Sequence, residues 1–264
     1  MIGFRTEREV MTTGYRDLAD VLRQAIQRGD HPPGSTLPKQ DEIAAEHGVN
    51  IKTVRQAVRL LEAEGLVTPV RRRGTVVRQH PPMKRLGVDR YAKRKWKSGL
   101  VAFAADREGS QREWKLTDQT QQVRQVPADP VVATALGIDE GTPVYERARL
   151  IKDGQTPTHT LTSYYRTEDV EGTPLIDPSP GPAGHGGGFA VLTGRGLEPD
   201  SITETLRGRM PTQEEIELLA LPAGEPVIEL HRTTYAAQSR AVEFARGIHA
   251  ASRFSWTYSF TIPE

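Results

Sequence analysis

The stretch from Asp41 to Arg78 constrains the fold of this 264-residue chain more than any other part of the sequence. It begins with a short apolar-striped segment that ends at Gly48, where a helix C-terminus favours a left-handed residue. A second predicted helix, over residues 50–64, repeats apolar side chains at spacings of three to five. Two β-type runs, at 66–68 and 75–77, then flank a basic tip. The pattern predicts a helix-turn-helix followed by a two-stranded ribbon.

The second helix has a polar face whose residue types suit phosphates and base edges, as they would in a major groove of DNA. The candidate DNA contacts on this helix, before it and on the basic tip are Lys39, Gln40, Asn50, Lys52, Thr53, Arg55, Gln56, Arg59, Arg71, Arg72, Arg73, Gly74 and Thr75. The alternative is an ordinary helical domain with a solvated basic face. A further predicted helix at 15–28, the triple-arginine tip and the distribution of charge favour DNA binding.

Charge is divided between the two ends of the chain. Residues 1–97 hold 20 Lys and Arg against 11 Asp and Glu, and the remainder holds 15 against 23, although the net charge is only +1. Such an asymmetry points to one part that binds nucleic acid. We predict a DNA-binding domain over 1–78, a basic, proline-containing linker over 79–97 and a second domain over 98–264. The run Lys93–Lys97 is either a solvated linker or a strap on DNA phosphates.

Several classes of protein are disfavoured by what the sequence lacks. There is no cysteine, so disulfides and thiolate metal sites are excluded. The first residues have no signal-peptide pattern, and no apolar run reaches the roughly 18 residues of a spanning helix, so we expect a cytoplasmic protein. No metalloprotease, nucleophile-elbow, phosphate-loop or dinucleotide motif is present. We therefore expect no catalytic residues, no metal and no cofactor.

The second half changes to short β-type runs interrupted by helical pieces. Strands are predicted at 101–103, 120–126, 144–152, 158–165, 202–209, 227–236 and 242–260, and helices at 130–136, 189–194 and 212–219. These elements indicate an α+β domain with a mainly antiparallel sheet. Residues 130–149 and 214–232 each give a helix, a Gly-x-Pro-Val turn and a strand that ends in arginine. This internal repeat predicts pseudo-symmetry in the sheet.

Residues 15–78 resemble the winged helix-turn-helix of the GntR superfamily of bacterial transcriptional regulators. The matching blocks, at fixed spacings, are Leu37-Pro38, residues 53–57, Leu61, Gly65-Leu66 and residues 73–75. The chain departs from the family pattern at 39–41 and at 50–51, where the family usually has DNA-contacting residues. Asp41 would repel phosphate, and Ile51 could pack on a thymine methyl but cannot bond guanine. We therefore expect an operator that differs from the usual half-site at one or two positions.

Residues 98–262 resemble the UTRA ligand-sensing domain, whose fold is related to chorismate lyase, and the two parts together resemble the HutC-type subfamily. The resemblance implies a small effector, often phosphorylated or acidic, bound on the sheet. Carried over by position, its candidate contacts are Arg147, Arg149, His159, Gly187, Gly188, Phe189, Glu243 and Arg246. Arg147 and Arg149, two apart on a strand, share a face and could converge on one anion, or they could be surface arginines in salt bridges.

Two further alternatives concern the same candidates. The glycines before Phe189 could cradle an anion at a helix N-terminus, or they could form a mobile loop. His159 could contact a ligand or be an ordinary strand histidine. The resemblance implies a homodimeric regulator, more often a repressor, that a small molecule releases from an inverted repeat in double-stranded DNA. The other interpretations are a regulator without an effector and an enzyme of the chorismate-lyase-like fold.

Overall fold

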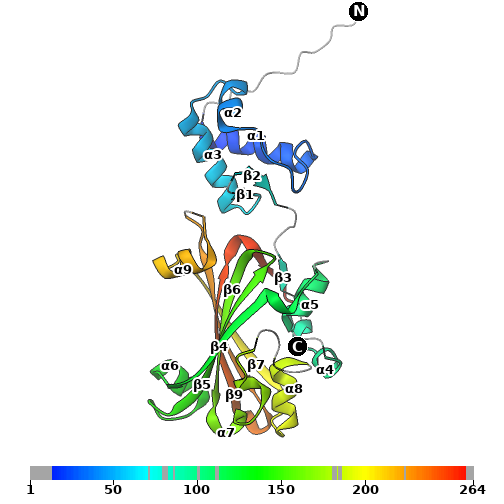
Figure 1. Ribbon diagram of the computed structural model, residues 1–264, viewed down its shortest axis with the longest axis vertical. Helices are drawn as coiled ribbons and strands as arrows, with labels where there is room; N and C mark the ends of the chain where they lie inside the picture. Colours follow the sequence, from blue (N-terminus) through cyan, green and yellow to red (C-terminus); the bar gives the residue numbers. More distant parts are fainter. Residues whose placement is uncertain are drawn as a thin grey trace, which may run out of the picture. The chain divides into compact units, whose positions relative to one another are not determined.

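The computed structural model describes residues 14–70, 72–78, 83–85, 87–99, 102–110, 113–179, 183, 186–222 and 224–259. The chain divides into two compact units (Figure 1). The first lies within residues 1–81 apart from one short loop segment, and the second holds nearly all of residues 82–264.

The first unit, called the head below, is the predicted winged helix-turn-helix. Its elements are α1 Tyr15–Arg28, α2 Gln40–Glu46, α3 Ile51–Ala63, β1 Val67–Val70 and β2 Gly74–Val77. α1 ends at Gly29, whose φ of 88° is the left-handed conformation that glycine adopts without strain. The apolar stripes of the three helices and the ribbon meet in one core, which includes Leu18, Leu22, Ile43, Val54, Leu61 and Val77.

The ribbon of the head has a third, shorter partner. β1 and β2 pair in antiparallel fashion, and Thr36 forms a bridge with Val76 on the other edge of β2. The amide of Leu37 also donates to the carbonyl of Thr75 at 2.8 Å. Because this extended segment leads into α2, the ribbon is fixed against the start of the helix-turn-helix.

The second unit, called the sheet unit, is built on six antiparallel strands in the order β4-β5-β6-β9-β8-β7. The strands are β4 Gln119–Pro127, β5 Pro143–Asp153, β6 Thr156–Arg166, β7 Ser201–Arg209, β8 Val227–Tyr235 and β9 Ala241–Ala250. α6 Pro130–Leu136 joins β4 to β5, and α9 Gln213–Leu219 joins β7 to β8. Each half of the sheet therefore runs strand, helix, strand, strand, which confirms the pseudo-symmetry predicted from the repeat.

The two faces of this sheet are covered by different helices (Figure 1). α6 and α9 lie on one face, where α6 packs on Val144, Tyr164 and Phe244. On the other face lie α4 Lys93–Lys97, α5 Ala102–Gly109 and α8 Gly187–Gly194. Short helical segments complete the unit: η1 Gly87–Tyr91, η2 Leu116–Asp118, α7 Thr167–Val170, η3 Pro174–Ile176, η4 Ala237–Ser239 and η5 Ala251–Arg253.

The structure differs from the sequence prediction over residues 83–97, which were predicted to be a linker. β3 Met83–Arg85 pairs in parallel with β10 Phe254–Trp256, and η1 and α4 follow it. Gly87 has a φ of 54°, and a Cβ there would lie 2.4 Å from the carbonyl oxygen of Thr257. Trp96 is only 4% exposed. A few widely spaced apolar residues anchor this segment. They are difficult to recognise in the sequence because most of their neighbours are basic.

Other details also depart from expectation. Residues 102–109 are helical, whereas a strand was predicted over 101–103, and residue 101 lies outside the described part. The basic run in α4 forms ion pairs within its own unit, since Lys93 and Lys97 both reach Glu198, at 2.9 and 3.2 Å. Across the described residues, no helix has the length and apolarity needed to cross a membrane, and no group of His, Cys, Asp and Glu is placed to hold a metal.

Candidate functional sites

The head presents an exposed polar face on α3, opposite its buried stripe. The exposed candidates are Lys52, Arg55, Gln56 and Arg59. The Nε of Arg55 donates to the side-chain oxygen of Gln40 at 3.3 Å, which joins α2 to α3. The guanidinium of Arg55 is thus held at the surface by a neighbouring helix rather than by a carboxylate.

Two other predicted contacts serve the start of α3. The side-chain oxygen of Asn50 accepts from the amide of Thr53 at 2.9 Å and from its hydroxyl at 3.2 Å. This is an N-cap, which satisfies an amide that the helix leaves without a partner. The adjacent Ile51 is 42% exposed. An apolar side chain is therefore exposed at the beginning of α3.

The remaining head candidates lie on the ribbon and before α2. Arg72 is exposed with a φ of 66°, and Arg73 donates to the carbonyl of Gly34 at 2.6 Å. The backbone amide of Lys39 donates to Glu42 at 2.8 Å as α2 begins. Gly74 and Thr75 form the start of β2. Arg71 lies outside the described residues.

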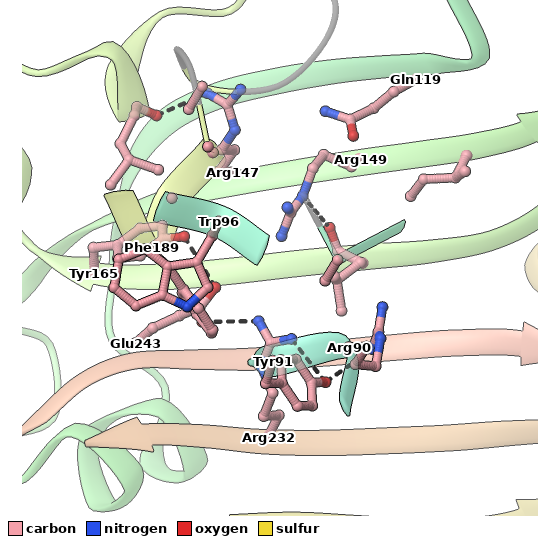
Figure 2. Close-up of a pocket in the computed structure, with 18 of the residues that line it drawn as sticks. Arg90, Tyr91, Trp96, Gln119, Arg147, Arg149, Tyr165, Phe189, Arg232 and Glu243 are labelled. Atoms are coloured by element: carbon pink, nitrogen blue, oxygen red, sulfur yellow. Dashed lines mark hydrogen bonds and ion pairs between the residues drawn. The ribbon is translucent and has the colours of Figure 1, made fainter. Parts of the chain in front are cut away.

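The sheet unit contains a cavity of about 100 Å³ on the face away from α6 and α9 (Figure 2). Seven of the eight predicted effector contacts line it: Arg147, Arg149, His159, Gly187, Gly188, Phe189 and Glu243. Three more arginines also line it, namely Arg85, Arg90 and Arg232. Apolar and aromatic side chains provide much of the remaining wall, among them Tyr91, Trp96, Tyr165 and Leu161.

Arg147 and Arg149 do lie on one face of β5, but they have different surroundings. Arg147 donates to the carbonyls of Leu175 and Asp177, at 2.9 Å each, and burial, followed by the nearby Arg149, lowers its pKa to about 10. Arg149 donates to the carbonyl of Leu161 at 3.1 Å and to the hydroxyl of Ser163 at 2.5 Å. Burial lowers the pKa of Arg149 as well. Arg147 thus holds the segment that covers the cavity, while Arg149 lies against neutral groups.

Glu243 is 2% exposed and fully engaged by the protein itself. One carboxylate oxygen accepts from Ser163 at 2.6 Å and Tyr165 at 3.0 Å, and the other accepts from Arg232 at 2.8 Å and Thr234 at 3.1 Å. Burial alone would raise the pKa of this carboxyl, but the Arg232 guanidinium and the Ser163 hydroxyl outweigh it and hold the pKa at about 2. Glu243 is therefore a permanent anion that orders the cavity floor.

Arg246 is the predicted contact that the structure places elsewhere. Its guanidinium bonds both oxygens of Asp129, at 2.6 and 2.7 Å, and lies over the rings of Tyr164 and Phe244. These residues belong to the α6 face. Successive side chains of a strand alternate between faces, so Glu243 and Arg246, three apart, point in opposite directions. The two-residue period of a strand could have shown, from the sequence alone, that Glu243 and Arg246 do not contact the same ligand.

The predicted glycine loop closes the cavity at the N-terminus of α8. Gly186, Gly187 and Gly188 all line the cavity. Gly186 has a φ of 83°, and a Cβ there would lie 2.3 Å from the carbonyl oxygen of Trp96. The α8 N-terminus thus packs directly on α4, and only glycine permits that approach. His185 lies outside the described residues.

His159 is a neutral member of the wall. It is 6% exposed, and its ring stacks on His249 with centroids 4.6 Å apart and planes 11° from parallel. Burial, followed by the charge of Arg85 and other arginines, lowers the pKa of His159 well below its usual value. The same burial, followed by His159 itself, lowers the pKa of His249. Neither ring is expected to attract an anion by charge at neutral pH.

Because of this histidine pair, we expect the folded protein to lose stability in mild acid. Each ring stays neutral when folded but takes up a proton below about pH 6.5 when unfolded, so the unfolded state binds more protons. The contribution of the pair is full above pH 6.5 and falls by up to about 1.4 kcal/mol per pH unit per histidine below it. Urea unfolding between pH 7.5 and 5.5 should show this slope. The double variant His159→Gln, His249→Gln should lose it, and an unchanged slope would contradict the assignment.

Among the lining residues that sequence reasoning missed, five are polar or aromatic side chains of β8 and of residues 83–97. Arg232 occupies in β8 the position that Arg149 occupies in β5, six residues after the proline of its Gly-x-Pro-Val turn. The internal repeat could have identified Arg232 as the counterpart of Arg149. The other four, Arg85, Arg90, Tyr91 and Trp96, belong to residues 83–97. No local pattern marks them, because their placement depends on pairing with β10 at the far end of the chain.

Comparison with known proteins gives consistent results for both units. Residues 14–77 match the family described as bacterial regulatory proteins, gntR family, and residues 114–255 match the UTRA domain. An HTH-type transcriptional regulator of Streptomyces coelicolor is 52% identical over 252 residues, covering 95% of this chain and 93% of that protein. The transcriptional repressor PhnF of Mycolicibacterium smegmatis is 28% identical over 236 residues, 85% of this chain and 84% of its own.

A solved structure extends the likeness to three dimensions. A GntR-family transcriptional regulator superposes with a TM-score of 0.57 at 27% identity, covering 96% of this chain and 99% of its own. Both the head and the sheet unit are therefore shared, in the same order, with relatives that align along nearly their whole length.

Proposed function

Because the chain belongs to the gntR family of bacterial regulators, in the HutC-type subfamily that joins a winged helix-turn-helix to a UTRA domain, we propose that it is a repressor released from its operator by a small anionic metabolite. DNA binding is the function of the head, and effector binding is that of the sheet unit. The proposal adds the charge of the effector and the residues that hold it.

The observation that supports an anionic effector is that Arg149 has no carboxylate partner in the part of the chain that the structure describes. Three other cavity arginines have carboxylate partners: Arg85 pairs with Glu204 at 3.3 Å, Arg90 with Asp106 at 2.8 Å and Arg232 with Glu243 at 2.8 Å. Within the described residues, Arg149 has no ion pair, and its bonds go to a carbonyl and a hydroxyl. Arg149 is half-buried, and a charge withdrawn from water is costly unless it is paired, so an anion placed beside Arg149 would offset that cost.

On the DNA side, we propose that two heads of a homodimer occupy successive major grooves of an inverted repeat. Arg55 and Lys52 would bond bases or phosphates of each half-site, while the exposed Ile51 would pack on a thymine methyl. The departures at 39–41 and 50–51 support an operator that differs from the family's usual sequence. Selection of binding sites from random DNA tests this, because recovery of the usual half-site as the best ligand would contradict it.

Replacing Arg55 with alanine should weaken specific operator binding by about 1–3 kcal/mol, since it removes a base or phosphate contact and the α2 link. Affinity for the selected operator and for a scrambled duplex, at one fixed salt concentration, provides the measurement. Arg16→Ala is the matched control, because Arg16 is also exposed but lies on α1. Undiminished operator affinity in Arg55→Ala would remove α3 from the interface.

Release by a metabolite is tested by footprinting the DNA upstream of the gene with and without fractions of host metabolites. A protected inverted repeat that is lost with one fraction supports the proposal and supplies an assay for the effector. Protection that no fraction alters would favour a regulator without an effector.

A further inference from the structure

Residues 83–97 fall between the two family matches, which cover 14–77 and 114–255, yet they form part of the cavity wall. β3 supplies Arg85, η1 supplies Arg90 and Tyr91, and α4 supplies Trp96. We call residues 83–97 the connecting segment, because the chain passes through it from the head to the sheet unit. Neither family match assigns a ligand contact to it.

Tyr91 fixes the connecting segment to the sheet. Its hydroxyl donates to a carboxylate oxygen of Glu204 on β7 at 2.5 Å. The hydroxyl oxygen of Tyr91 also accepts from Arg90 at 2.8 Å and from Arg232 on β8 at 3.3 Å. The hydroxyl therefore lies at the centre of a partly buried polar group, and Figure 2 shows it beside Arg90 and Arg232.

A continuous series of hydrogen bonds links this tyrosine to Arg149. Arg149 donates to Ser163 at 2.5 Å, and Ser163 donates to Glu243 at 2.6 Å. Glu243 accepts from Arg232 at 2.8 Å, and Arg232 donates to Tyr91. The series crosses β5, β6, β9 and β8 before it reaches η1. The distance between Arg149 and the connecting segment is thus set by buried and partly buried hydrogen bonds.

Three aromatic rings line the cavity near this end. The centroids of Tyr91 and Phe189 are 6.0 Å apart, and those of Trp96 and Phe189 are 6.3 Å apart with planes at 88°. All three rings also line a neighbouring surface groove with Val88 and Ile202, so they separate the cavity from that groove. The guanidinium of Arg232 lies over the rings of Tyr91 and Phe189, 5.5 and 5.7 Å from their centroids, and Arg149 lines the same cavity. A cavity that combines aromatic walls with a guanidinium lacking a carboxylate partner among the described residues matches a ligand that carries both a ring and an anion.

We propose that Tyr91, Trp96 and Phe189 bind the ring of an aromatic organic acid whose anionic group is held by Arg149. The connecting segment is then part of the effector site, and ligand occupancy acts directly on the stretch of chain that leads to the head. This inference rests on the proposed function and adds the ligand class and the role of Tyr91 and Trp96.

The test uses the full chain and five defined probes at equal concentration. Benzoate and phenyl phosphate carry a ring and an anion, acetate and inorganic phosphate carry the anion alone, and benzyl alcohol carries the ring alone. Thermal unfolding midpoints should rise with the first two and stay unchanged with the other three, since ligands that bind only the folded state stabilise it. The stronger of benzoate and phenyl phosphate identifies the anionic group as a carboxylate or a phosphate.

Variants then locate the ring. Tyr91→Leu should weaken binding of the better probe by roughly 3- to 10-fold, the range expected for loss of one aromatic contact. Tyr91→Phe keeps the ring and should retain most of the affinity. Arg94→Ala is the matched control, because Arg94 lies in the same segment, is exposed and is absent from the cavity wall. Unfolding midpoints without probe establish that each variant is folded.

The outcomes separate this inference from the proposal on which it rests. Equal stabilisation by ring-bearing and ringless anions would assign the site to a bare anion and overturn the ligand class. Unchanged probe affinity in Tyr91→Leu would overturn the assignment of the ring to Tyr91. In both cases an anion still binds, so the proposed anionic effector stands. If no anion raises the midpoint, both the aromatic acid and the anionic effector are contradicted, while operator binding is unaffected.

Discussion

Replacing Glu243 with leucine is expected to lower the free energy of unfolding by about 3–5 kcal/mol, the typical cost of removing one partner from a buried ion pair. The change would leave the Arg232 guanidinium without its carboxylate and would remove the acceptor of Ser163, Tyr165 and Thr234. Urea denaturation near pH 7 measures the difference, because the carboxyl is ionised far below that pH.

Two further variants make this expectation specific. Glu243→Gln keeps acceptor capacity but loses the charge, and it should fall between the wild type and Glu243→Leu. Arg124→Ala breaks the ion pair between Arg124 and Glu146, in which the Arg124 side chain is 68% exposed, and should destabilise the protein far less than Glu243→Leu does. Equal losses in Arg124→Ala and Glu243→Leu would show that burial does not determine the strength of these pairs.

Replacing Arg149 with methionine is expected to abolish most of the effector response while leaving operator binding intact. Loss of a charged hydrogen bond to an anion costs about 1.5–3 kcal/mol, which corresponds to roughly 10- to 150-fold weaker binding. The half-effective concentration of the effector in an operator-release assay gives the measurement, with probe binding to the free protein as a second readout.

The stability of the Arg149 variant distinguishes a ligand contact from a structural one. Because Arg149 is half-buried and has no ion pair among the described residues, methionine should leave the empty protein about as stable as before or more so. Arg207→Met, on the exposed strand β7, is the control for a general effect of lost charge. A large loss of stability with an unchanged effector response would contradict the assigned role.

The head was predictable because its signals are local. Helix stripes, the glycine at the end of α1, the cap at Asn50 and fixed motif spacings all act within a few residues, and they reproduce the elements from α1 to β2. The sheet strands were likewise predictable from β-type runs between turn residues. In contrast, the short apolar run at 101–103 carries no periodicity, so the helical state of residues 102–103 was not predictable.

The cavity was only partly predictable. Strand spacing placed Arg147 and Arg149 on one face, but it could not indicate that Arg147 would hold backbone carbonyls while Arg149 would lie beside neutral groups. Arg149 and Arg232 occupy equivalent positions in the two halves of the sheet, and only the second pairs with Glu243. That difference arises from which side chain the neighbouring central strand presents, which is a matter of tertiary register.

The parallel pairing of β3 with β10 also sets an order of events during synthesis. All elements of the head lie before residue 78, so it can be completed while the ribosome is still translating the sheet unit. The connecting segment, however, cannot be anchored until Phe254–Trp256 has emerged, because those residues are the partner of Met83–Arg85. In a nascent chain, the DNA-binding head can thus fold well before the effector site is complete.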